Sequence, residues 1–209
     1  MNEHQRVIIY GAGETGISIA EWLLQDYSDL YTLSGFIDDN RKKHKYPVPI
    51  LGDSRELKHI KEDGLDNLIL GFVYPVKERL RKGLELLDEG FHFPSLYEQG
   101  LDKKWGVSLG QGVLIYHASV NPNVKFGNFV GINAYSDVEA SEIGDGVIIT
   151  PQVFIGAGSS IGKGTIVYPG ATILPNIKIG EFCEIGPNTV VHKDIESGRK
   201  YIRYNHKKD

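Results

Sequence analysis

Between Ile143 and Val191 the sequence reads IGDGVI, ITPQVF, IGAGSS, IGKGTI, VYPGAT, ILPNIK, IGEFCE and IGPNTV, and an aliphatic residue opens every block. A six-residue period fits neither a helix of 3.6 residues per turn nor a strand of period two. It fits a coil in which each hexapeptide forms one flat face and directs one aliphatic side chain inward. Three such faces complete a turn, so the stretch predicts a parallel β-helix.

Length and composition limit the function classes. The chain has 209 residues and a net charge of −4, which allows one large or two small domains and argues against nucleic acid or an anionic membrane as partner. Its single cysteine, Cys183, excludes an intramolecular disulfide and a cysteine-rich zinc site; inside the repeat we expect it to be a buried apolar residue. No apolar run approaches a membrane span and residues 1–6 are polar, so we expect a cytoplasmic protein without a metal.

The N-terminal part opens with a strand, a glycine-rich turn and a helix. RVIIY (6–10) is followed at once by GAGETG, and Ile17, Ala20, Leu23 and Leu24 then have helical spacing. Gly11, Gly13 and Gly16 match the G-x-G-x-x-G pattern, which presents backbone N–H groups and a helix N-terminus to a phosphate. A second apolar run, 32–37, ends in Asp38 and Asp39, which are placed to accept hydrogen bonds from a ribose. The alternative is that the glycines only make a tight turn.

The remainder of residues 1–95 alternates strands and helices. We expect a short strand and turn over 48–53, a helix capped by Ser54, a central parallel strand over 67–72, a helix over 76–87 that ends before Gly90, and a last short strand at 91–93. The alternation predicts a small, mostly parallel α/β sheet, Rossmann-like in form. The domain is short for a dinucleotide, so its length disfavours dinucleotide binding.

The second half begins with a connector without periodicity over 96–108. From residue 109 the six-residue pattern is less regular, and its inward residues are expected at Leu109, Ile115, Val120, Phe126, Ile132, Val138 and Ile143. Two steps are only five residues long, Ile115 to Val120 and Val138 to Ile143, where we expect a shortened corner or a re-aimed loop. The coil then runs to 194, and the polar segment 195–209 is expected to cap its open end.

Together the two halves resemble the sialic-acid O-acetyltransferase and UDP-amino-sugar N-acetyltransferase group of bacterial surface-glycan enzymes. The resemblance rests on GAGETG, GFIDDN (35–40) and VPILGD (48–53) joined to the hexapeptide coil. It implies a left-handed coil, a homotrimer, a nucleotide-linked sugar held by Gly11, Gly13, Asp38 and Asp39, and acetyl-CoA or another acyl-CoA in the groove between neighbouring coils. Gly156, Gly158 and Lys178 are the residues that the resemblance suggests for the acyl-CoA.

The chain departs from the family at the position of the catalytic base. Members carry a His-Asp pair shortly before an IGD step, whereas Ile143-Gly144-Asp145 follows Asp137-Val138-Glu139-Ala140-Ser141-Glu142, with no histidine and one residue fewer. Glu139 lies closest to the missing histidine and His117 lies one coil earlier, so these two residues are the candidates for a general base. Each has a simpler interpretation, Glu139 as a solvated corner carboxylate and His117 as a surface histidine.

The sequence thus leaves three functions open. The first is an acyltransferase that acts on an amino or hydroxyl group of a nucleotide-linked sugar in surface-glycan synthesis. The second, motivated by the missing His-Asp pair, is a catalytically altered or inactive trimeric protein that binds a nucleotide-sugar or acts as a scaffold. The third is an NAD-dependent oxidoreductase that uses Gly11, Gly13 and Gly16, although no second substrate domain is visible.

Overall fold

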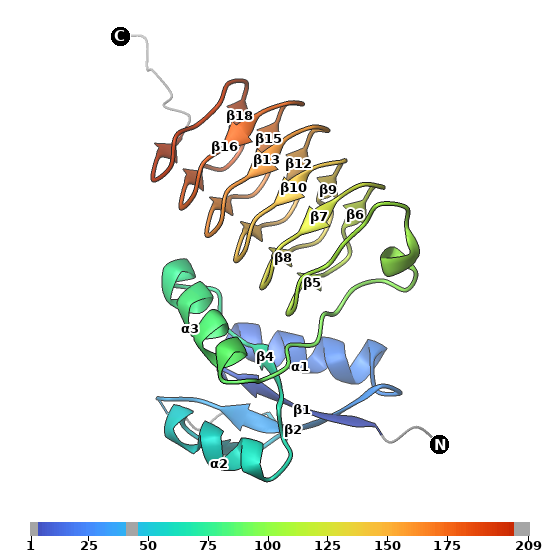
Figure 1. The fold of residues 1–209 in the computed structure, drawn as a ribbon, viewed down its shortest axis with the longest axis vertical. Coiled ribbons are helices and arrows are strands. Elements are labelled where there is room, and N and C mark those ends of the chain that lie inside the picture. The colour runs from blue at the N-terminus through green and yellow to red at the C-terminus, as the bar shows by residue number, and fades with distance from the viewer. Residues whose placement is uncertain (1–3, 41–45, 203–209) are drawn as a thin grey trace. The chain divides into compact units, whose positions relative to one another are not determined.

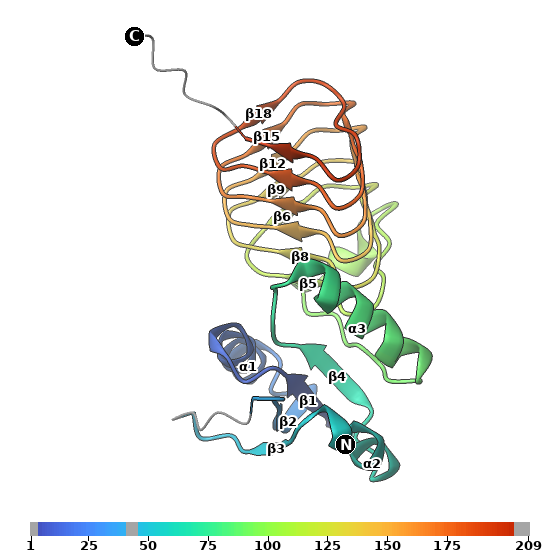
Figure 2. The same cartoon turned by 90° about the vertical axis from the view of Figure 1, so that its left-hand side faces the viewer.

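The computed structural model describes residues 4–40 and 46–202. The chain divides into two units, Met1–Pro94 and Ser95–Asp209, which are described separately (Figures 1 and 2). The α/β and β-helix classes predicted for the two halves are both present.

The first unit is a four-stranded parallel sheet in the order β3-β2-β1-β4. Its strands are β1 (Gln5–Tyr10), β2 (Tyr31–Ile37), β3 (Ile50–Gly52) and β4 (Asn67–Leu70). Helix α1 (Glu14–Asp26) lies on one face, and α2 (Leu57–Glu62) and α3 (Val76–Asp88) lie on the other (Figure 2). The connections leave β1 and β4 in opposite directions, and this switch point is where such sheets bind ligands.

Three local expectations for this unit are wrong. Strand β4 is not central, because beyond it the sheet continues only as a single bridge from Asn67 to His92. Asp53, not Ser54, caps the short 3-10 helix η1 (Ser54–Glu56) that leads into α2, since its side chain accepts a hydrogen bond from the Arg55 N–H at 3.0 Å. Leu24, expected on the inner side of α1, is 43% exposed.

The buried stripes of the two long helices include small or charged residues that a purely apolar pattern overlooks. In α1 the buried residues are Gly16, Ile19, Ala20 and Leu23. In α3 they are Arg79, Leu80, Gly83 and Leu86. Leu84, part of the apolar repeat seen in the sequence, is exposed at the surface of α3.

The second unit is a left-handed β-helix with three parallel faces of two-residue strands. The first face holds β5 (Leu114–Ile115), β8 (Gly131–Ile132), β11 (Ile148–Ile149), β14 (Ile166–Val167), β17 (Glu184–Ile185) and β19 (Lys200–Tyr201). The second holds β6 (Ser119–Val120), β9 (Asp137–Val138), β12 (Phe154–Ile155), β15 (Thr172–Ile173) and β18 (Val190–Val191). The third holds β7 (Lys125–Phe126), β10 (Glu142–Ile143), β13 (Ser160–Ile161) and β16 (Lys178–Ile179).

The inward positions are those predicted from the six-residue period. The second residue of every strand from β5 to β18 is buried, and Leu109 packs half-buried against the same core. Cys183 is also buried, as expected.

The five-residue steps are shortened corners, because Ile143 still pairs in register with Phe126 and Ile161. Val153 also lies in this core, whereas Phe154 on the outer side of β12 is half-buried.

Buried hydroxyl groups join successive coils at the corners. Thr165 Oγ1 donates to the Gly180 carbonyl at 2.8 Å and accepts the Cys183 N–H at 3.0 Å. Ser159 does the same with Leu174 and Ile177. Each hydroxyl accepts the N–H of a buried residue and donates to a carbonyl oxygen of the next coil, so it joins two successive coils.

Both ends of the coil are built from segments whose sequence shows no period. The predicted connector packs against the first coil: Leu96 bridges Leu114, Leu101 is buried in the core, and η2 (Leu101–Lys103) forms one helical turn. At the other end Ile195 bridges Ile179 and β19 pairs with β17. The segment predicted to be a cap therefore extends the coil as far as residue 202, and 203–209 lie outside the described residues.

Candidate functional site

The first unit contains a cavity of about 640 Å³ at the carboxyl ends of β1, β2 and β4. Its lining comes from the loops that follow these three strands: Tyr10, Gly11, Gly13, Glu14, Thr15, Asp38, Asp39, Asn40, Gly71, Phe72, Val73 and Tyr74. All four residues expected to bind the nucleotide-linked sugar, Gly11, Gly13, Asp38 and Asp39, line this one cavity. Thr15, Asn40 and the 71–74 loop were not foreseen, since no motif marks them.

The glycine-rich turn can exist only with glycine at two of its positions. Gly11 has φ +111°, a left-handed conformation that side chains resist. At Gly16 a Cβ would lie 1.9 Å from the Gly11 carbonyl oxygen, so the start of α1 packs directly on the turn. Gly13 is different, because a Cβ there would meet nothing within 4 Å. Gly13 is also the N-cap of α1, with no side-chain cap bond, so the cavity faces an uncapped helix N-terminus that favours an anion.

Asp38 holds this turn in place. Its Oδ2 accepts the Ala12 N–H at 2.8 Å and its Oδ1 accepts the Asn40 N–H at 2.8 Å. A carboxylate oxygen can accept a second hydrogen bond, so Asp38 remains able to receive a hydroxyl group from a ligand.

Asp39 is held by Tyr10 and Ser54. Its two oxygens accept the Tyr10 hydroxyl at 2.5 Å and the Ser54 N–H at 2.8 Å. Burial opposes ionisation of Asp39, but the hydrogen bonds from Tyr10 and Ser54 outweigh it and lower the pKa of this carboxyl. Burial, reinforced by the bond to Asp39, raises the pKa of Tyr10 far above its usual value, so Tyr10 stays a donor.

The cavity lining is acidic. Glu14, Asp38 and Asp39 supply three carboxylates, and none of the described lining residues is Lys or Arg. The features of the described lining that suit a phosphate group are the backbone N–H groups of the turn and the dipole of α1.

In the second unit Glu139 lies at the corner between the second and third faces. Its Oε2 accepts the Ala157 N–H at 2.9 Å, and its own N–H donates to Ile155 O at 3.0 Å. Ala157 lies between Gly156 and Gly158, so three of the residues suggested for acyl transfer share one corner. Lys178 is the exposed residue of β16 and directly follows the same corner in the following coil.

His117 lies at a different corner, between the first and second faces. It has φ +47°, its ring lies against that of Tyr116 with centroids 4.3 Å apart and the planes tilted by 59°, and its Nδ1 lies 3.8 Å from Glu98 Oε1. Its side chain is 57% exposed. The structure therefore does not bring the two candidate bases together.

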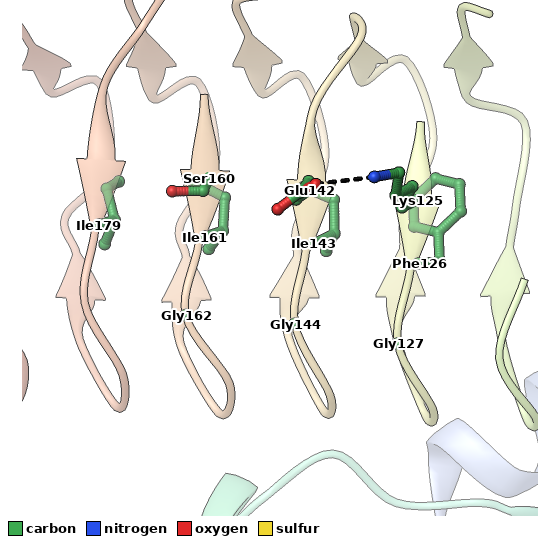
Figure 3. Close-up of a pocket in the computed structure, with 10 residues that line it drawn as sticks. All are labelled: Lys125, Phe126, Gly127, Glu142, Ile143, Gly144, Ser160, Ile161, Gly162 and Ile179. Atoms are coloured by element: carbon green, nitrogen blue, oxygen red, sulfur yellow. Dashed lines mark hydrogen bonds and ion pairs between the residues drawn. The ribbon is translucent and has the colours of Figure 1, made fainter. Parts of the chain in front are cut away.

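The third face carries a shallow groove of about 420 Å³ (Figure 3). Its outward residues are Lys125, Glu142 and Ser160, and Lys125 pairs with Glu142 at 2.9 Å. Gly127, Gly144 and Gly162 line it further along the same strands and leave backbone accessible. The outward position of each hexapeptide could have identified these residues, because it precedes the inward aliphatic residue.

Among residues 4–40 and 46–202, no three His, Cys, Asp or Glu side chains are grouped as metal ligands. No helix within the same ranges has the length and apolar character needed to cross a bilayer.

Comparison with known proteins supports the fold. Residues 158–193 match the family described as bacterial transferase hexapeptide (six repeats). The chain is similar to a mutant of perosamine N-acetyltransferase from Caulobacter crescentus, solved with CoA and GDP-perosamine, at 23% identity and a TM-score of 0.84 over 94% of this chain and 93% of that one. The acetyltransferase domain of PglB from Neisseria gonorrhoeae, in complex with acetyl coenzyme A, gives 20% identity and 0.84 over 96% and 97%.

WeeI from Acinetobacter baumannii gives 21% identity and a TM-score of 0.74 over 93% of this chain and 94% of that one. No curated protein sequence matches significantly. The fold is that of the hexapeptide sugar acetyltransferases. The resemblance read from GAGETG, GFIDDN and the coil is thus confirmed at the level of fold, over nearly the whole length.

Proposed function

We propose that this chain transfers an acyl group, acetyl in the first instance, from acyl-CoA to an amino or hydroxyl group of a nucleotide-linked sugar used for a bacterial surface glycan. The observation that carries the proposal is the cavity of the first unit. Loops after three parallel strands bring a glycine-rich turn, a helix N-terminus and Asp38 together, which suits a ligand with both phosphate and hydroxyl groups. The neighbours solved with CoA, acetyl-CoA or GDP-perosamine support the same chemistry.

In the proposed reaction the sugar nitrogen or oxygen attacks the thioester carbonyl carbon. The C–N or C–O bond forms, the C–S bond breaks, and the proton of the nucleophile ends on the CoA sulfur. Backbone N–H groups of the coil would stabilise the oxyanion. Glu139 is the first candidate base, because it shares its corner with Gly156 and Gly158; His117 is the second. A homotrimer, with acyl-CoA between neighbouring coils, and a cytoplasmic location belong to the same proposal.

One observation favours the alternative of a binding or scaffold protein. The Glu139 Oε2 already accepts the Ala157 N–H at 2.9 Å, so this carboxylate takes part in the framework that joins two successive coils. If neither Glu139 nor His117 takes a proton, the first unit still binds the nucleotide-sugar and the coil only assembles the protein.

Thermal unfolding with separate ligands tests the proposal. Acetyl-CoA, CoA, UDP-linked and GDP-linked amino-sugars and NAD are compared, because a ligand at about 100 times its Kd stabilises the native state by about 2.7 kcal/mol. We expect shifts of a few degrees with acetyl-CoA and with one nucleotide-sugar, and release of free CoA thiol when both are present. A shift with the nucleotide-sugar alone, without thiol release, would establish the binding protein. A shift with NAD alone would support the oxidoreductase.

A further inference from the structure

A buried cation stands directly behind the cavity of the first unit. Arg79 lies near the start of α3 and is 2% exposed. Burial lowers the pKa of this guanidinium to about 10, so it remains charged at neutral pH. Together with Asp53 it is one of two charged residues that are buried among the described residues.

Arg79 is joined to the cavity wall by a hydrogen bond. Its Nε donates to the Phe72 carbonyl oxygen at 2.9 Å, and it makes further interactions besides this one. Phe72 lines the cavity, and its ring meets the ring of Tyr10 edge-on with centroids 5.7 Å apart. A Cβ on Gly11 would touch the same ring at 3.4 Å. The guanidinium therefore fixes the 71–74 loop against the glycine-rich turn.

Arg79 also places a positive charge behind a cavity whose described lining includes three carboxylates. A nucleoside diphosphate carries at least two negative charges at neutral pH. A charge inside a protein is screened far less than one at the surface. The Arg79 guanidinium, which is bonded to the lining residue Phe72, thus offsets the negative charge of the carboxylates without occupying space in the cavity.

We infer that Arg79 is the positioning residue and the electrostatic counter-charge for the phosphate groups of the ligand in this cavity. The inference rests on the proposed function, because it takes the ligand to be a nucleoside diphosphate derivative. It goes beyond that function because it assigns the preference for phosphate to Arg79, a residue that does not itself line the cavity.

The test measures the affinity of the full chain for UDP and for uridine, and for GDP and guanosine. The quantity of interest is the gain in affinity that the two phosphates provide. Replacement Arg79→Met should reduce this gain by about tenfold or more, in addition to any loss of nucleoside affinity that follows from loosening the 71–74 loop. The matched control is Arg81→Met, which removes an exposed cation of α3 that pairs with Glu78 and Glu85 outside the cavity; here the gain should stay within about twofold.

A second variant keeps the inference testable if Arg79→Met does not fold. In Arg79→Lys the same burial lowers the pKa of the lysine ammonium towards neutrality. The phosphate gain should therefore decline between about pH 7 and pH 9 in Arg79→Lys and remain level in the wild type. A purely structural residue would not produce this difference.

Two results would overturn the inference while the proposed function stands: an unchanged phosphate gain in Arg79→Met, or a pH-independent gain in Arg79→Lys. An equal loss of UDP and uridine binding in Arg79→Met would likewise reduce Arg79 to a structural role. If the wild type binds none of the four probes, both the proposed function and this inference fail.

Discussion

The two units differ in how their sequence motifs relate to chemistry. In the α/β unit, Gly11, Gly13, Asp38 and Asp39 are up to 28 positions apart and yet line one cavity. In the coil, the candidate bases lie at different corners, and Glu139 is already bonded to the next coil. The glycine-rich turn is irregular because Gly11 takes a positive φ and α1 packs directly on the turn at Gly16, whereas the hexapeptide repeat is regular because every coil stacks on the next. In this molecule the irregular motif brings distant residues to one cavity, and the periodic motif builds the framework.

The largest expected effect comes from the glycine-rich turn. Gly16→Ala places a methyl group against the Gly11 carbonyl and should destabilise the α/β unit by about 3 kcal/mol or more. Gly13→Ala is the matched control, because its Cβ meets nothing and its φ of −78° suits alanine. It should keep its stability and weaken nucleotide binding. Thermal unfolding and nucleotide titration of both variants measure the two effects, and a stable Gly16→Ala would contradict the packing described.

The coil should respond next most strongly to loss of a buried hydroxyl. Thr165→Val keeps the shape but leaves the Gly180 carbonyl and the Cys183 N–H without their partner, which should cost about 1 to 3 kcal/mol. Thr172→Val, on the outer side of β15, should change the free energy of unfolding by less than about 0.5 kcal/mol. Chemical denaturation compares them. Equal values for the two would mean that the hydroxyl bonds between coils contribute nothing.

Substitutions of Glu139 show whether this residue only joins two coils or also acts as a general base. Glu139→Ala should destabilise the coil by about 1 kcal/mol, because the Ala157 N–H loses its acceptor. Glu139→Gln retains an acceptor oxygen and should be nearly neutral. Turnover, measured as thiol release, decides the second role: a thousandfold loss in Glu139→Gln with stability intact identifies the base, and unchanged turnover removes Glu139 from the mechanism.

The smallest effect concerns the acid sensitivity of the α/β unit. The native pKa of Asp39 is lowered, so its ionised form contributes stability above its unfolded-state pKa near 4, and this contribution is lost as the pH falls through the native value. Tyr10→Phe removes one of the bonds that lower this pKa. The difference in Tm between wild type and Tyr10→Phe should therefore be present at pH 7 and shrink below about pH 4. A difference that grows on acidification would reverse the assignment.

The sequence predicted most of the frame because burial follows local patterns. The inward residues from Ile115 to Val191 and the strand-turn-helix at residues 5–26 depend on spacing alone. It could not predict contacts between coils, such as Glu139 with Ala157 at a separation of 18 residues, because they depend on where each corner stacks. The sequence also did not reveal the burial of Arg79, because a charged residue in a helix is expected at the surface until the packing is known. Leu96 and Leu101 pack against the coil although they lie outside the six-residue pattern, so the pattern could not predict their positions.

Hydrogen exchange of the full chain, with and without saturating UDP-linked or GDP-linked amino-sugar, tests the division between the two units most directly. We expect slower exchange in the peptides that contain residues 10–16, 38–40 and 71–74, with little change in the coil. Protection confined to the coil, with the glycine-rich turn unaffected, would contradict it.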